Sequence, residues 1–189
     1  LGRTVQRDSR TATVENFMDR YHVDRTHAQR VAAMATTLYT RAVRLPIPES
    51  AQRLEWAALL HEIGYTVSHI GFHKHGAYIL EHADMPGFSA QEQRQLALLV
   101  LGARGGLAKA VQVLAIPDLA AQILALRLAV LFHHARRAIG APRITLTMGR
   151  PIRFGIAARW LKAHPLTAHL LDKEREEWAA LSRPWRAIR

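Results

Sequence analysis

Residues 56–80, WAALLHEIGYTVSHIGFHKHGAYIL, hold the densest group of histidines in this sequence, beside an apolar helix. The stretch ends that helix at the pair His61-Glu62 and then carries His69, His73 and His75. Histidine changes its charge near neutral pH and is the commonest metal ligand in proteins. We therefore expect this stretch to form a functional site, or the remnant of one, around the end of a helix.

Apolar residues on both sides of this stretch recur with helical spacing, which predicts a mainly α-helical domain of about seven or eight helices. Asp24 is expected to cap one helix, Ser89 and Glu92 form a capping-box pattern, and Gly64 is expected to end a helix. Residues 117–137 contain the most apolar helix, which we expect to be central. The expected helices cover residues 13–21, 25–43, 49–62, 72–83, 90–101, 107–115, 117–137 and 166–181.

A different pattern occurs near the C-terminus. Residues 143–148 and 152–156 alternate polar and apolar side chains around Gly149, which predicts one small β-hairpin at about 143–156. A hairpin alone is marginally stable, so it must pack on the helical body. Residues 1–10 are polar and begin with Leu1 rather than Met, so we expect them to be a connector from a missing upstream domain. Residues 11–189 are then one domain.

The composition favours polyanionic partners. The chain has 26 Lys and Arg against 15 Asp and Glu, a formal net charge of +11, and no cysteine. The charge favours polyphosphate, nucleotides, nucleic acid or anionic lipid, and the alternative is a solvated arginine-rich surface. The lack of cysteine excludes disulfides and thiolate metal sites and fits a reducing compartment. No apolar run is long enough to span a bilayer, so we expect a cytoplasmic protein with no membrane partner.

The histidine spacing matches part of the ligand pattern of metal-dependent phosphohydrolases of the HD class. His27, His61 and His75 stand where those enzymes have histidines, and Glu62 stands where they have Asp. Such imidazoles and carboxylates hold divalent metals that activate a bound water. However, Glu62 is one methylene longer than Asp, and Val130 cannot ligate a metal. We therefore interpret the group as a degenerate HD pocket without metal or catalytic residues. A divergent metal-dependent HD phosphohydrolase acting on a nucleotide or phosphate ester is the alternative.

The stretch extends into a block that closely resembles a known family. Residues 57–100, AALLHEIGYTVSHIGFHKHGAYILEHADMPGFSAQEQRQLALLV, resemble the C-terminal region of the Ppx/GppA phosphatases, which are exopolyphosphatases and guanosine pentaphosphate phosphatases. The similarity begins near Asp8 and reaches LLDKEREEW at residues 170–178. It implies an HD-like helical domain without its metal, attached behind two actin-like domains. Those domains carry the catalytic carboxylate, so no catalytic residue is assigned here.

The resemblance also implies a role for this domain. It would be the accessory domain of an exopolyphosphatase-like hydrolase, binding inorganic polyphosphate or another polyanion and supporting a homodimer. The fragment alone would be inactive and hold no cofactor, and the parent enzyme would use Mg²⁺. The substrate-binding positions implied by the match are His69, His73, Lys74 and Arg127.

Further cationic candidates lie at the end of the apolar helix. A polyphosphate chain needs repeated cationic contacts, and Lys and Arg donate charge-assisted hydrogen bonds to its oxygens. His133, His134, Arg136 and Arg137 are the candidates in this segment. For the two arginines the alternative is that the helix dipole favours cations at a C-terminus. A nucleic-acid binder is a third hypothesis, which rests on charge alone because no recognised motif is present.

Overall fold

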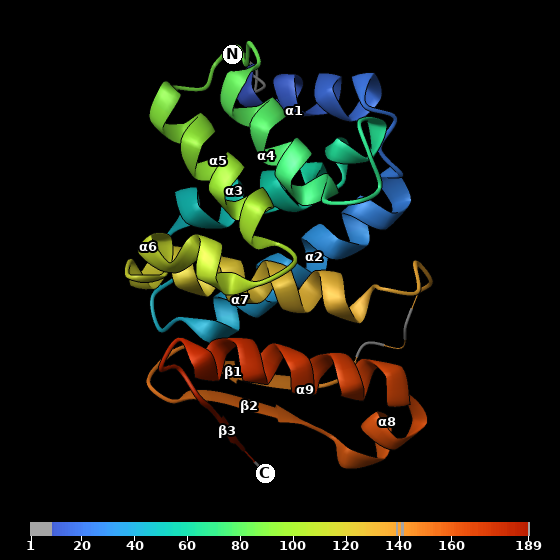
Figure 1. Cartoon of the computed structure of the whole chain (residues 1–189), viewed down its shortest axis with the longest axis vertical. Coiled ribbons are helices and arrows are strands. Elements are labelled where there is room, and N and C mark those ends of the chain that lie inside the picture. The colour runs from blue at the N-terminus through green and yellow to red at the C-terminus, as the bar shows by residue number, and fades with distance from the viewer. Residues whose placement is uncertain (1–8, 139, 141, 189) are drawn as a thin grey trace, which may run out of the picture.

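The computed structural model describes residues 9–138, 140 and 142–188. A helical body occupies residues 9–132, and a smaller layer of helices and strands closes it on one side (Figure 1). The fold is therefore mainly helical, as the sequence predicts. The body contains α1 (Ser9–Arg20), α2 (Arg25–Ala42), α3 (Pro48–Leu60), the 3-10 helix η1 (Ile63–Thr66), α4 (Phe72–His82), α5 (Ala90–Gly102), the 3-10 helix η2 (Leu107–Ala110), α6 (Val111–Leu114) and α7 (Pro117–Phe132).

Local signals begin several of these helices where the sequence predicts. Asp24 caps α2 by accepting a hydrogen bond from the backbone N–H of His27. Ser89 and Glu92 form both bonds of a capping box at the start of α5. The central position of α7 is also confirmed, because its side chains are buried on all faces and it packs against α2, α3, α5 and α9.

Three expected boundaries differ from the structure. Helix α3 ends at Leu60, and Gly64 lies within η1 instead of capping α3. A Cβ atom at Gly64 would lie 1.9 Å from the carbonyl oxygen of Phe72, so glycine permits the close approach of η1 to α4. Helix α7 ends at Phe132, five residues before the expected 137, where the chain turns. Of the expected connector, residues 1–8 lie outside the described residues, while Ser9 and Arg10 belong to α1.

The C-terminal layer contains the expected hairpin and two additional elements. Strands β1 (Ile144–Thr147) and β2 (Ile152–Ile156) pair antiparallel, with Ile144 opposite Ile156. The sequence reading missed β3 (Trp185–Ala187), which pairs parallel with β2, and the short helix α8 (Ala158–Ala163). Helix α9 (Pro165–Ala180) packs beside the sheet, where it contacts β3, and it passes in front of β1 in Figure 1.

The sheet is attached to the helical body through α2. The backbone N–H of Met148 donates to the carbonyl of Ala42 at 2.7 Å, and Arg41 donates to the carbonyl of Ile144 at 3.0 Å. The hairpin thus packs on the helices, as its marginal stability alone requires. Among the described residues, no helix combines the length and apolar character needed to cross a membrane.

Candidate functional site

Three ionisable side chains meet at the ends of two helices, and two of them, His27 and Glu62, line a cleft. His27 lies in the first turn of α2, and His61 and Glu62 follow the last residue of α3. All three are buried, and one ligand-capable atom from each lies within 4.8 Å of the other two. The structure therefore brings together three of the four residues of the predicted pocket. The fourth, His75, is half-buried on α4 and does not line this cleft.

Backbone carbonyls set the orientation of two histidine rings near this group. The Nδ1 atom of His61 lies 2.6 Å from the carbonyl oxygen of Ala58, and Nδ1 of His133 lies 2.9 Å from that of Ala129. A carbonyl can only accept, so each Nδ1 carries the hydrogen and each Nε2 presents a lone pair when the ring is neutral. Burial lowers the pKa of both rings, which keeps them neutral at pH 7.

His133 also lines this cleft, close to His27, although it was not among the residues predicted for the degenerate HD pocket. Its ring centroid lies 6.5 Å from that of His27, which in turn lies 5.8 Å from that of His61. The pair His133-His134 at the end of the apolar helix was the available signal in the sequence. Only the crossing of α7 over α2 shows that His133 reaches His27.

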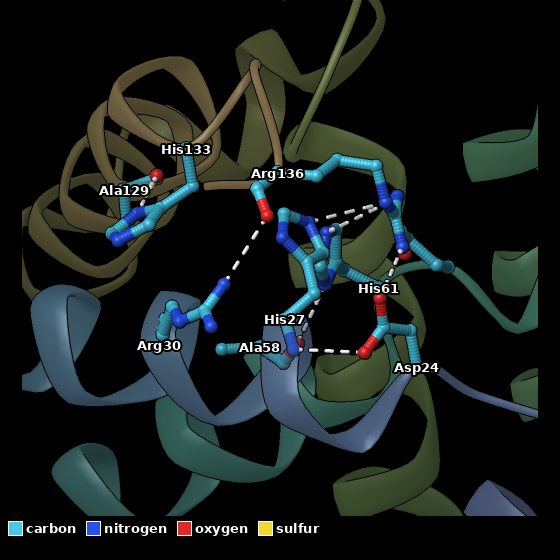
Figure 2. A network of polar contacts seen from close by, with 9 residues as sticks. Asp24, His27, Arg30, Ala58, His61, Ala129, His133 and Arg136 are labelled. Atoms are coloured by element: carbon cyan, nitrogen blue, oxygen red, sulfur yellow. Dashed lines mark hydrogen bonds and ion pairs between the residues drawn. The ribbon is translucent and has the colours of Figure 1, made fainter. Parts of the chain in front are cut away.

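An arginine closes the cleft over Glu62. The Nη1 atom of Arg136 donates to Glu62 Oε1 at 2.7 Å, and its Nη2 donates to Asp24 Oδ2 at 3.2 Å. Figure 2 shows the Arg136 side chain extending over His27 and His61 toward Asp24. These hydrogen bonds, with that to Glu62 as the largest cause, raise the pKa of Arg136. The sequence offered Arg136 as a polyphosphate contact or as a cation favoured at a helix C-terminus, and its pairing with Glu62 was not predicted.

The donor set suits a transition metal, but its carboxylate is engaged. Two imidazoles and a carboxylate are suitable ligands for ions such as Zn²⁺, Co²⁺ or Ni²⁺. Val130, in place of the carboxylate of HD enzymes, lines the same cleft of about 420 Å³ and offers no ligand atom. The Arg136 guanidinium already bonds Glu62. In this arrangement the group therefore holds a guanidinium.

A second concentration of positive charge surrounds the start of α4. His73 is buried there, and its Nδ1 atom has no hydrogen-bond partner among the described residues. Burial, followed by the charges of Lys109, Lys74 and Arg104, lowers the pKa of His73 to about 4. His69 is exposed next to Tyr65, with 4.9 Å between the ring centroids. His73 and Lys74, predicted to bind substrate, are thus part of this cluster.

Arg127, the remaining predicted binding residue, is engaged inside the protein. Its Nε and Nη2 donate to the two carboxylate oxygens of Glu174 at 2.6 and 2.7 Å. Its Nη1 donates to the carbonyls of Gly102 and Gly105, both at 2.9 Å. Because the guanidinium is buried and bonded on both sides, this geometry favours a structural role.

These observations define a mainly helical domain in which a buried histidine–glutamate group is closed by an arginine, beside a cationic cluster. The chain belongs to the Ppx/GppA phosphatase family, because the sequence model of Ppx/GppA phosphatase, domain III, matches residues 9–175. The family expected from the sequence is confirmed.

Two relatives show how much of a longer protein this chain represents. It is 34% identical over 189 residues to the guanosine-5'-triphosphate,3'-diphosphate pyrophosphatase of Pseudoalteromonas translucida (strain TAC 125), covering 96% of this chain and 37% of that protein. It is 33% identical over 175 residues to the protein of the same name from Vibrio vulnificus (strain YJ016), covering 89% and 35%. The chain thus spans little more than a third of the length of these curated relatives.

Proposed function

We propose that this chain is the C-terminal accessory domain of a phosphoanhydride hydrolase and that it binds a polyphosphate-like anion. Family membership and the 37% and 35% coverage of two pyrophosphatases support this proposal. Catalysis and its Mg²⁺ belong, in this proposal, to actin-like domains of the parent. Inorganic polyphosphate and guanosine pentaphosphate are the two substrate candidates for that parent.

The observation that carries the binding proposal is the α4 cationic cluster, which we define as His73, Lys74, Arg104 and Lys109. Burial and the charge of Arg127, followed by that of Lys74, lower the pKa of Lys109 to about 8. A Cβ atom at Gly105 would lie 3.1 Å from Lys109 Nζ and 3.3 Å from His73 Nε2, so these groups converge on one loop. A bound anion would relieve the repulsion between them.

The start of α4 adds to the attraction for an anion. Its N-cap, Gly71, provides no side-chain hydrogen bond, and the N-terminus of a helix carries partial positive charge. Lys74 lies in this first turn and is exposed. His69 lies on the adjacent loop and is also exposed, so it can extend the contact surface. Repeated cationic contacts of this kind suit a flexible phosphate chain.

Equilibrium binding of long-chain inorganic polyphosphate to this chain tests the proposal. We expect binding that weakens as salt rises, because released counterions drive such contacts. The double variant Lys74→Gln/Arg104→Gln should bind about tenfold or more weakly, because it removes two charge-assisted contacts. The matched control is Lys162→Gln/Arg159→Gln, which removes the same charge from α8.

Equal weakening by the two double variants would show that binding follows net charge alone and would overturn the proposed location. Binding of duplex DNA in the same assay distinguishes the polyphosphate proposal from the nucleic-acid hypothesis. The nucleic-acid hypothesis predicts that DNA binds at least as tightly as polyphosphate. Phosphate release from polyphosphate by this chain alone would contradict an accessory role. Light scattering during gel filtration tests the proposed homodimer. A monomer at all concentrations would contradict the proposed dimerisation.

A further inference from the structure

Hydrogen-bond donors converge on the loop beside α4. Lys109 Nζ and His73 Nε2 lie 3.1 and 3.3 Å from the position that a Cβ atom at Gly105 would take, so both reach the same point of the loop. Nδ1 of His73 is buried and has no hydrogen-bond partner among the described residues. A buried N–H without an acceptor is especially rare, so the ring hydrogen belongs on Nε2, toward Lys109. An acceptor between these two donors would be favourable.

Lys109 is held in place and is open to solvent. Its Nζ donates a hydrogen bond to the backbone carbonyl of Arg104, and the residue is exposed. Partial burial of the amine, followed by the charges of Arg127 and Lys74, lowers its pKa to about 8, while Glu177 acts in the opposite direction. At pH 7.5 about a quarter of these amines are uncharged, against about one in a thousand at the ordinary pKa of 10.5. Neighbouring cations activate a lysine nucleophile in this way.

We propose that Lys109 is a reversible modification site that takes up carbon dioxide as a carbamate. The lone pair of the uncharged Nζ bonds to the carbon of CO₂, one pair of C=O electrons moves to oxygen, and one N–H proton leaves to solvent. The product carries a negative charge and two acceptor oxygens, which can accept from Nε2–H of His73. The charges of Lys74 and Arg104 stabilise this anion. The cationic surroundings thus favour both the reactive amine and its product.

The carbamate would also change how the α4 cationic cluster binds anions. The modified Lys109 side chain is negative, so polyphosphate should bind more weakly to the modified chain. This consequence rests on the proposed function, whereas the modification itself does not. Glu177, the acidic group that acts on Lys109, is already engaged, because its Oε2 accepts from the backbone N–H of Leu107 at 2.9 Å. Carbon dioxide would therefore regulate anion binding at this cluster.

Carbon-13 NMR of the chain in ¹³C-labelled bicarbonate at pH 7.5, which supplies labelled CO₂, tests for the carbamate. We expect a carbamate resonance that Lys109→Gln loses and that Lys162→Gln, at an exposed position of α8, retains. Alkylation of the carbamate oxygen with a trialkyloxonium salt, followed by peptide mass spectrometry, locates the group. The sequence has four lysines, at positions 74, 109, 162 and 173. Occupancy at Lys109 should exceed that at each of the others by about tenfold or more.

A second variant tests the cause. Lys74→Gln removes a cation that keeps the Lys109 amine uncharged and stabilises the carbamate, so occupancy should fall by about threefold or more, unlike in Lys162→Gln. The proposal is overturned if no resonance depends on Lys109, if the four lysines are labelled alike, or if Lys74→Gln leaves the occupancy unchanged. Polyphosphate binding in bicarbonate and in chloride at equal ionic strength tests the proposed function separately. Unchanged affinity of a carbamylated chain would contradict the location of polyphosphate at α4 and not the modification.

Discussion

Arg127 of α7 and Glu174 of α9 form a buried ion pair with two hydrogen bonds, of 2.6 and 2.7 Å. Glu174 also accepts a hydrogen bond from the indole N–H of Trp178 at 2.7 Å. The guanidinium bonds two further carbonyls, those of Gly102 and Gly105. One side chain thus connects the helical body, the loop after α5 and the C-terminal layer.

Replacing Arg127 with Met should lower the free energy of unfolding by about 3–5 kcal/mol, because it leaves the Glu174 carboxylate buried without a partner. Urea denaturation followed by circular dichroism measures the change. The control is Arg175→Met on α9, next to Glu174, because the pairing of Arg175 with Asp172 is exposed and worth about 1 kcal/mol or less. Equal losses in the two variants would show that the buried pair does not hold the layers together.

Gly64 should tolerate no side chain. Gly64→Ala places a Cβ atom 1.9 Å from the Phe72 carbonyl oxygen and 2.6 Å from the Gly76 backbone nitrogen, so η1 must move away from α4. We expect the free energy of unfolding to fall by about 3 kcal/mol or more, at the upper end of overpacking costs. Gly140→Ala, where nothing lies within 4 Å of the added Cβ atom, is the control and should be nearly neutral. A small loss for Gly64→Ala, measured by urea denaturation, would contradict this close packing.

Asp118 should stabilise the junction of α2, α3 and α7. Its carboxylate accepts hydrogen bonds from Tyr39 at 2.5 Å, Ser50 at 2.7 Å and Gln122 at 2.8 Å. We expect Asp118→Ala to lower the free energy of unfolding by about 2–4 kcal/mol, since partly buried donors lose their acceptor. Thermal unfolding measures this effect.

The same network affects the titration of Tyr39. Burial, and then the hydrogen bond to Asp118, raise the pKa of the Tyr39 hydroxyl. Loss of the carboxylate should therefore move this pKa back down, as ultraviolet absorbance of the phenolate would show. Asp84→Ala, at an exposed position, is the control. An unchanged Tm in Asp118→Ala would remove the structural role that we assign to the network.

Acid should destabilise the domain through His73. Burial and neighbouring cations lower the pKa of this ring from 6.5 to about 4, so between these values the unfolded chain binds more protons than the folded one. Stability contributed by the neutral ring is therefore present above pH 6.5 and is lost as pH falls toward 4, at no more than about 1.4 kcal/mol per pH unit. The groups facing His73 are Lys109, Lys74, Arg104 and Arg127.

The difference between wild type and His73→Asn isolates this contribution. The variant cannot titrate, so its free energy of unfolding should change less between pH 7 and 4.5 than that of the wild type. His22→Asn is the control, since His22 is exposed and asparagine accepts its φ of 50°. Parallel pH profiles for His73→Asn and the wild type would contradict the assigned cause.

Signals within a few residues of one another were sufficient to predict much of this fold. The cap of Asp24 on α2 and the capping box of Ser89 and Glu92 on α5 depend only on local hydrogen bonds, and both are confirmed. The hairpin follows from alternation around Gly149. Strand β3 was missed because its pairing with β2 joins residues about thirty positions apart, and three residues carry too weak a periodic signal.

The sequence by itself determined most of the helices, the hairpin and the family, because periodicity, caps and a long motif are properties of neighbouring residues, while α8 and the ends of α3 and α7 escaped it. It also placed His61 beside Glu62. Only the tertiary structure decided what meets them: Arg136 lies 74 residues from Glu62 in the chain, yet it reaches that carboxylate because α7 crosses α2 and the chain then turns. No local pattern encodes the burial and charge at this crossing. They are the reason that Arg136, which follows the end of α7, pairs with the buried carboxylate of Glu62.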